Sequence, residues 1–179
     1  FCYNPLYSKR QWRALSAPRL LELLKSLVET YGVKAFHFID DGFFIDKDRT
    51  REIMTGVLKQ RWSIKMGFQG ARVDTIDQMT DADLDLVAEA GGAFLQVGVE
   101  SGSPRILEIL NKRIHPDQVV AFNRRLSRYP QMKVYYNFMC GFPSETRDDF
   151  LRTTDLAWSL LRDSPNALIS AFHFYKPYS

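Results

Sequence analysis

Hydrophobic residues follow two alternating patterns along the chain. Short runs rich in β-branched and aromatic residues recur at intervals of about 30 to 40 residues, the length of a βαβ unit. These runs cover residues 35–39, 64–68, 94–99, 133–138 and 168–174. The segments between them have the i, i+3, i+4 spacing of amphipathic helices. The pattern therefore predicts strands that alternate with helices.

Start and stop signals locate the expected helices. Leu20, Leu24 and Leu27 share one face of a first helix, which follows Pro18 and stops at Gly32. The same signals, with apolar residues at helical spacing between them, mark the later segments. Further helices are expected around 53–58 and over 80–91, 104–110, 116 onward and 146–161.

This order of elements defines the expected fold. Strands joined by helical crossovers are parallel, and the crossovers are right-handed, so the sheet should curl with its helices outside. We predict an α/β fold, a partial (β/α)6 TIM-like barrel of parallel strands truncated before the first strand and at the sixth, forming one domain over residues 1–179. A closed eight-stranded barrel needs ~250 residues. Periodicity leaves an open doubly wound sheet as the alternative, and both architectures bind ligands at the carboxyl ends of strands.

Composition narrows the class of protein further. With 45% hydrophobic and 25% charged residues in 179, the chain has the composition of a globular domain, which excludes disorder. A net charge of +3 is too small to indicate a nucleic-acid partner. No apolar run approaches the ~20 residues that span a bilayer. Cys2 and Cys140 form no disulfide framework, which agrees with a cytoplasmic location.

Polar residues at the ends of the first two strands are candidates for ligand binding. Asp40 and Asp41 end the first run, directly before Gly42. This acidic pair could cap the next helix or bind a divalent metal. Arg72 follows the second run, and its planar guanidinium suits a carboxylate. An ion pair with a nearby aspartate, such as Asp74, is the alternative for Arg72.

The third and fourth strands carry further candidates. Glu100 follows the third run, and a carboxylate is a good acceptor for two neighbouring hydroxyls, as in a ribose. The glycine-rich turn after Glu100 could instead cradle a phosphate, which this glutamate would repel. Lys112 could be a helix C-terminal lysine. Asn137 lies in an otherwise apolar strand, where a buried amide needs a partner.

Other residues are expected to be structural. The turn at 141–146 should cap the last helix through Thr146 and Asp149, with Glu145 part of that turn. Cys140 has the features of a small buried residue. The three histidines, His37, His115 and His173, are also expected to be structural. The basic group Arg124, Arg125 and Arg128 is expected to form a solvated helix face.

Three motifs in this order resemble the radical S-adenosylmethionine (radical SAM) superfamily, most closely the enzymes associated with cobalamin. They are Phe1-Cys2, the stretch 98–103 and the stretch 141–146. The family's cluster motif, C-x-x-x-C-x-x-C, usually has an aromatic residue before its third cysteine. The resemblance therefore implies that Cys2 is a cluster ligand and that the chain begins after the other two. Without the resemblance, Cys2 would be a free thiol near a terminus.

The resemblance also implies cofactors and residue roles. The cofactors are a 4Fe-4S cluster and S-adenosylmethionine, whose reductive cleavage yields a 5′-deoxyadenosyl radical. The pair Asp40-Asp41 departs from the Gly-Gly-Glu form common in the superfamily. The implied contacts are Asp40, Asp41 and Gly42 to the cofactor's ammonium, Arg72 and Lys112 to its carboxylate, Glu100 and Asn137 to its ribose, and Met139 and the backbone near Tyr175 to its adenine.

The substrate is not indicated by any residue, but the resemblance implies classes of reaction. One is methyl transfer or ring formation on a small molecule, with cobalamin bound by a domain outside this chain and electrons from a donor such as flavodoxin or ferredoxin. The chain alone should then be inactive. Alternatives within the superfamily are methylthiotransferases and porphyrinogen oxidases. Two alternatives from other classes are a non-catalytic S-adenosylmethionine-binding barrel and an aldolase-type phosphate-binding barrel.

Overall fold

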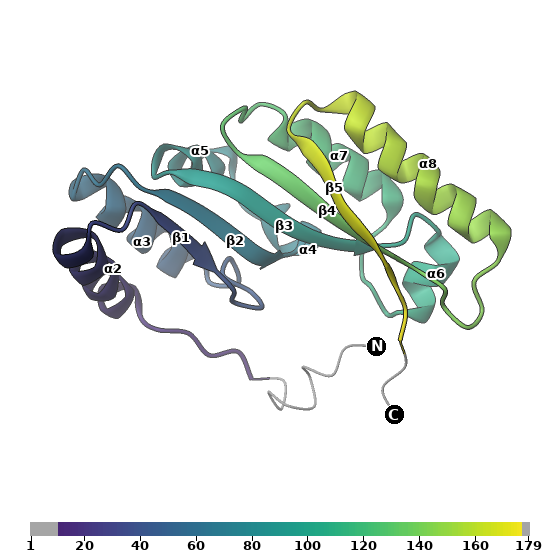
Figure 1. Cartoon of the computed structure of the whole chain (residues 1–179), viewed down its shortest axis with the longest axis horizontal. Helices are drawn as coiled ribbons and strands as arrows, with labels where there is room; N and C mark the ends of the chain where they lie inside the picture. Colours follow the sequence, from purple (N-terminus) through teal and green to yellow (C-terminus); the bar gives the residue numbers. More distant parts are fainter. Residues whose placement is uncertain (1–10, 177–179) are drawn as a thin grey trace.

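The computed structural model describes residues 11–176. A curved sheet forms its centre, and the helices gather along one face of that sheet (Figure 1). All neighbouring strands are parallel and pair in sequence order, as predicted. The strands are β1 (Ala35–Phe38), β2 (Lys65–Ala71), β3 (Gly92–Glu100), β4 (Lys133–Cys140) and β5 (Ala167–Phe174). The predicted partial barrel of parallel strands is confirmed by this sheet.

The helices begin and end close to the predicted residues. They are α2 (Ala17–Tyr31), α3 (Lys47–Lys59), α4 (Val73–Ile76), α5 (Asp81–Glu89), α6 (Pro104–Ile109), α7 (Pro116–Leu126) and α8 (Arg147–Asp163). Gly32 ends α2 with a left-handed φ of 65°, the conformation for which glycine carries no side-chain penalty. The short helix α4 was not predicted, since a single turn gives no helical periodicity.

Side-chain caps fix several helix starts. Thr80 and Thr146 form the capping boxes of α5 and α8, which confirms the prediction for Thr146. His115 caps α7, a structural role as expected. Asp46 caps α3 by accepting a hydrogen bond of 2.9 Å from the Arg49 backbone N–H. The alternative in which Asp40 or Asp41 caps the next helix is therefore wrong.

Alternation along the strands separates a filled face from an open one. In β3, Leu95, Val97 and Val99 are buried in the core between sheet and helices. Gln96 and Gly98 alternate with them and lie on the opposite, concave face. Cys140 is buried at the end of β4, as expected. The hydrophobic core thus covers one face of the sheet, and the concave face carries the residues that can contact a ligand.

The basic group at the end of α7 and just after it differs from its prediction. Arg125 and Arg128 both form ion pairs of 2.8 Å with Asp81 at the start of α5. Arg125 also donates a 2.6 Å hydrogen bond to the Met79 carbonyl. These arginines connect α7 to α5, so the expectation of a merely solvated face was wrong for them. Among residues 11–176, no helix is both long and apolar enough to cross a membrane.

Candidate active site

A cavity of about 590 Å³ lies at the carboxyl ends of β2, β3 and β4. Its lining combines both signs of charge with several amide side chains. Six of the residues predicted to bind the cofactor line it: Asp41, Arg72, Glu100, Lys112, Asn137 and Met139. The other lining residues are Gln69, Gly70, Ala71, Gln96, Gly98, Leu110 and Asn111. The fold therefore brings together polar residues that the sequence separates by up to 96 positions, from 41 to 137.

An ion pair joins two of the predicted residues across this cavity. Nζ of Lys112 lies 2.7 Å from Oε1 of Glu100, and the two side chains are 17% and 13% exposed. A Cβ atom at Gly98 would collide with the Glu100 carboxylate and come within 3.2 Å of the Lys112 ammonium. Gly98 thus leaves the space in which this pair forms.

The turn after α6 positions Lys112. Asn111 has a φ of 51° and follows the last residues of α6 in the left-handed conformation that asparagine tolerates. The chain then reverses, and the Lys112 backbone N–H donates a 2.8 Å hydrogen bond to the Leu107 carbonyl. This turn directs Lys112 toward the strand ends, where it pairs with Glu100 in the cavity lining. The alternative in which Lys112 only caps a helix C-terminus does not account for this position.

Arg72 lies in the cavity lining but is held by a neighbour. Its Nε and Nη2 donate to the two carboxylate oxygens of Asp74 at 2.9 and 2.6 Å. Burial disfavours the charge of Asp74, but the hydrogen bonds and charge of Arg72 outweigh burial and lower the pKa of that carboxyl. This is the ion pair that the sequence left as the alternative. A ligand carboxylate would have to compete with Asp74 for the guanidinium.

Asn137 carries the clearest sign of a missing partner. It pairs with Gly98 in the register of β3 and β4, so its side chain lies beside the space that Gly98 leaves. Its Oδ1 is buried and accepts no hydrogen bond from the described residues. A buried acceptor without a donor costs about 1–3 kcal/mol. A ligand hydroxyl in the cavity would donate the hydrogen bond that this oxygen lacks.

Three predicted residues lie outside this lining, and a fourth, Cys2, lies outside the described residues. Gly42 accepts a 3.1 Å hydrogen bond from Trp12 Nε1 and, like Asp40, is outside the cavity lining. Tyr175 is also outside this lining, with its ring packed on Phe142 at a centroid distance of 5.3 Å. Their predicted contacts with the cofactor stay predictions.

Two glutamines and a glycine of the lining were not predicted from the sequence. Gln96 lies two residues before Gly98 in an otherwise apolar strand, the same signal that identified Asn137. Gln69 lies near the end of β2, where it precedes Gly70. Gly70 has a φ of 69°, and a Cβ there would lie 2.7 Å from the Asp40 carbonyl oxygen. Gly70 therefore lets the end of β2 approach the loop that carries Asp41.

Two alternative ligands for these loops find little support. In the glycine-rich turn, the Gly102 N–H donates to Thr153 Oγ1 at 3.0 Å and the Ser103 N–H donates to Ser101 Oγ at 3.1 Å. These backbone donors are engaged within the protein, so they do not form a phosphate cradle. Within residues 11–176, no group of three or more His, Cys, Asp or Glu side chains is placed to hold a metal ion.

Comparison with known families agrees with this geometry. Residues 1–157 match the radical SAM superfamily. The chain therefore belongs to the radical SAM superfamily, the family that its motifs resemble.

Curated relatives include several enzymes. An uncharacterized methyltransferase from Pyrococcus horikoshii is 31% identical over 160 residues, which cover 89% of this chain and 34% of that protein. A tRNA-2-methylthio-N(6)-dimethylallyladenosine synthase from Pseudothermotoga lettingae is 35% identical over 82 residues, 44% of this chain and 19% of that protein. The chain thus spans about a third or less of the length of these relatives.

Solved structures share the fold. The cobalamin-dependent S-adenosylmethionine radical enzyme OxsB matches with a TM-score of 0.67 and 24% identity, over 83% of this chain and 23% of that one. Coproporphyrinogen III oxidase from Escherichia coli matches with a TM-score of 0.61 and 13% identity, over 89% of this chain and 37% of that one. At these identities the likeness concerns the fold.

Proposed function

We propose that the whole protein binds S-adenosylmethionine in the cavity at the carboxyl ends of β2–β4 and uses it for radical chemistry. The observation that supports this most is the buried, unpartnered Oδ1 of Asn137 beside Gly98, within reach of a cavity that also holds both charges of the Glu100–Lys112 pair. A zwitterionic nucleoside offers hydroxyl donors, a carboxylate and an ammonium, which match these groups in kind.

Binding would exchange partners within the site. Lys112 would turn from Glu100 to the ligand carboxylate, and Glu100 would accept hydrogen bonds from ribose hydroxyls, so both charged groups keep a polar partner on binding. Met139 on the same face of β4 offers an apolar contact for the adenine. The remaining roles follow the family resemblance: Arg72 at the carboxylate, Asp40, Asp41 and Gly42 at the ammonium, the backbone near Tyr175 at the adenine edge, and Cys2 at the cluster.

A 4Fe-4S cluster together with S-adenosylmethionine would supply a 5′-deoxyadenosyl radical by reductive cleavage of the sulfonium. The described residues serve this chemistry by orienting the cofactor and by giving it a site on the concave face of the sheet. Electrons would come from a donor such as flavodoxin or ferredoxin. Such a protein fits a cytoplasmic location, in keeping with the free, buried thiol of Cys140.

Methyl transfer or ring formation with cobalamin is the reaction class that we propose for the whole protein. It is supported by the methyltransferase relative that covers 89% of the chain and by the fold shared with OxsB, a cobalamin-dependent enzyme. The second candidate is methylthiotransfer, favoured by the 35% identity to the tRNA-modifying synthase over 82 residues. Cobalamin binding by the purified whole protein would support the first candidate over the second.

Isothermal titration of the whole protein with S-adenosylhomocysteine tests the cofactor site directly. We expect saturable binding that weakens by about tenfold in Asn137→Ala, because one hydrogen bond to the ribose is lost. Titration with a phosphosugar is the matched control and should give no heat of binding. Binding of the phosphosugar without S-adenosylhomocysteine would instead support the aldolase-type barrel.

A further inference from the structure

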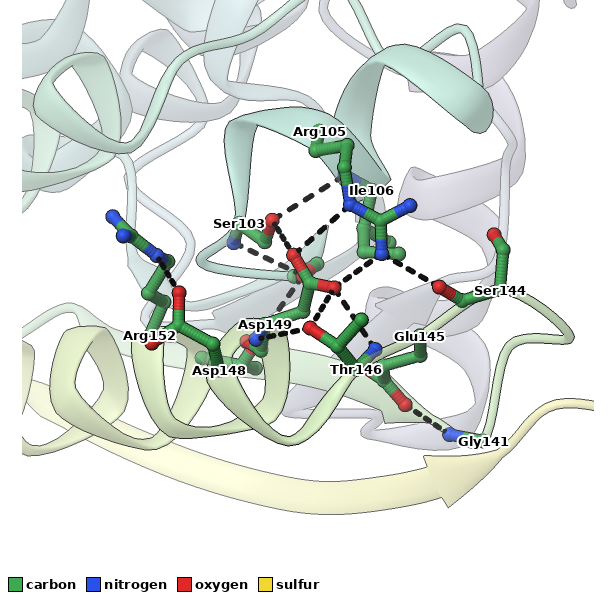
Figure 2. A network of polar contacts seen from close by, with 12 residues as sticks. Ser103, Arg105, Ile106, Gly141, Ser144, Glu145, Thr146, Asp148, Asp149 and Arg152 are labelled. Carbon is green, nitrogen blue, oxygen red and sulfur yellow. Dashed lines mark hydrogen bonds and ion pairs between the residues drawn. The ribbon is translucent and has the colours of Figure 1, made fainter.

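A polar network centred on buried side chains joins the turn after β3 to the start of α8 (Figure 2). We call it the α8 network. It consists of hydroxyl, carboxylate and guanidinium groups that bond across more than 40 positions of sequence. Its members are Ser101, Ser103, Arg105, Thr146, Asp149 and Thr153. The cofactor site described above includes none of these side chains.

Asp149 is the centre of this network. Its Oδ1 accepts a hydrogen bond of 2.5 Å from Ser103 Oγ, and its Oδ2 accepts from the backbone N–H and the hydroxyl of Thr146 at 2.9 and 2.6 Å. Arg105 donates to Oδ2 as well and pairs with the carboxylate. The Asp149 side chain is 7% exposed. The hydrogen bond from Arg105 is the largest cause that holds the pKa of this carboxyl well below its usual range.

Thr153, one turn later on α8, holds the other part of the turn. Its hydroxyl lies 2.9 Å from Ser101 Oγ and accepts a hydrogen bond of 3.0 Å from the Gly102 N–H. A Cβ atom at Gly102 would collide with the Arg152 carbonyl, so the turn lies directly against the backbone of α8. Ser101 and Thr153 are completely buried. The turn 101–103 is therefore fixed at every residue.

Glu100 directly precedes this turn and has an unusual backbone. Its φ of 74° lies in the left-handed region, which a non-glycine residue rarely adopts. Such a conformation costs about 1–3 kcal/mol and persists where the surrounding structure over-determines it. The pairing of β3 with β4 shifts register between Gly98 and Glu100, an irregularity of the kind that accompanies left-handed residues in strands. The fixed turn 101–103 then holds the backbone on the other side of Glu100.

We propose that Asp149 and Thr153 are positioning residues, which hold the left-handed backbone of Glu100 through the turn 101–103 and so aim its carboxylate into the cofactor cavity. This proposal rests on the proposed function in one respect, the assignment of Glu100 to the cofactor. Arg105 links the same network to a second turn, because its Nη2 donates a 2.6 Å hydrogen bond to the Ser144 carbonyl. Ser144 belongs to the turn that follows β4, the strand of Asn137 and Met139.

The neighbouring residue Asp148 provides a matched control. It lies on the same turn of α8 and pairs with Arg152 at 2.9 Å, but its side chain is 73% exposed (Figure 2). In the whole protein, under conditions where each variant is folded, we expect Asp149→Asn to bind S-adenosylhomocysteine at least about tenfold more weakly. Asp148→Asn should stay within about twofold of the parent, since exposed pairs contribute little. Thr153→Val serves as the second variant, because it keeps the shape of the side chain.

A purely structural cap would give a different result. Asp149→Asn would then lower the urea midpoint of unfolding while the folded protein bound the ligand as tightly as the parent, and that outcome overturns the proposal. A double-mutant cycle with Glu100→Gln adds a direct test. If Asp149 acts through Glu100, Asp149→Asn should weaken binding by less than about twofold in the Glu100→Gln background. If instead Asp149→Asn weakens binding by the same factor in the Glu100→Gln background as in the parent, the two residues act independently and the proposal is contradicted.

A second readout needs no ligand and separates this proposal from the proposed function. Glu100→Gln, Lys112→Met and their double variant give the coupling of the ion pair in urea unfolding. We expect a coupling of about fivefold or more in the unfolding constant of the parent, and less than about twofold when Asp149→Asn is also present. If Asp149→Asn abolishes the coupling but the parent protein does not bind S-adenosylhomocysteine, the positioning is supported and the cofactor assignment is refuted. Unchanged coupling would refute the positioning itself.

Discussion

The Lys112 ammonium lies 2.7 Å from the Glu100 carboxylate, and both side chains face a cavity at the ends of the central strands. Each member of the pair is at most 17% exposed, so each depends on the other for a partner within the described residues. The left-handed backbone of Glu100 and the left-handed turn at Asn111 aim the two side chains at one another. The pair therefore depends on the local backbone geometry at two places, the end of β3 and the end of α6.

Lys112→Met should destabilise the protein, because it leaves the Glu100 carboxylate in a partly desolvated site without its cation. The expected loss is about 1–3 kcal/mol in the free energy of unfolding, measured by urea denaturation. The Glu100→Gln/Lys112→Met double variant should recover most of this loss, since no charge then lacks a partner. A double variant that is less stable than Lys112→Met would contradict this account of the pair.

Gly98→Ala should weaken binding of S-adenosylhomocysteine by about tenfold or more, measured by titration calorimetry. The added Cβ takes the space of the Glu100 carboxylate and approaches Lys112, so the pair must move. Gly32→Ala is the matched control: its φ of 65° makes alanine strained, but a Cβ there meets nothing within 4 Å. It should cost about 1 kcal/mol of stability and leave the affinity unchanged. Equal affinities of all three proteins would refute the role of Gly98.

Asn137→Leu should have opposite effects on the free and the bound protein. It removes a buried acceptor that lacks a donor, so the free energy of unfolding without ligand should stay equal or rise by about 1 kcal/mol. Binding of S-adenosylhomocysteine should weaken by at least about tenfold. Thermal unfolding with and without the ligand measures both effects in one series. A strongly destabilised variant would show that Asn137 has an internal partner after all.

Asp83 should set part of the acid sensitivity of the fold. Its carboxylate accepts hydrogen bonds from Arg51 Nε at 2.6 Å and from the Thr80 N–H at 2.8 Å, and the bond from Arg51 is the main cause of its lowered pKa. Because the folded pKa lies below the unfolded value of about 3.9, this contribution is present above that pH and is lost as the pH falls through the folded pKa. Asp83→Asn should therefore be less stable at pH ~7 and lose stability less steeply below pH ~4. Urea unfolding across this range measures it, and parallel pH curves for variant and parent would contradict the prediction.

Much of the fold follows from the sequence because its signals are local. The strands alternate with strongly amphipathic helices, and residues such as Gly32, Thr80 and Thr146 mark the helix ends. The cap of α3 was missed because Asp46 competes with the more conspicuous pair Asp40-Asp41, and local sequence does not show which aspartate faces the helix.

The site was predicted less completely because it depends on contacts between distant segments. Asn137 was identified by its polarity in an apolar strand, and Gln96 carried the same signal without being recognised. The pairing of Lys112 with Glu100 was not predicted, since it follows from two left-handed residues that no sequence pattern announces. The links from Asp149 to Ser103 and Arg105 are also long-range, although the capping role of Asp149 was predicted from local spacing.

Formation of 5′-deoxyadenosine is the most direct test of the central claim, that the whole protein cleaves S-adenosylmethionine reductively. The whole protein, supplied with iron and sulfide without oxygen and reduced with dithionite, should release 5′-deoxyadenosine from S-adenosylmethionine, and its Cys2→Ala variant should release none. Equal release by the variant, or none by a parent that carries a four-iron cluster, would contradict the account.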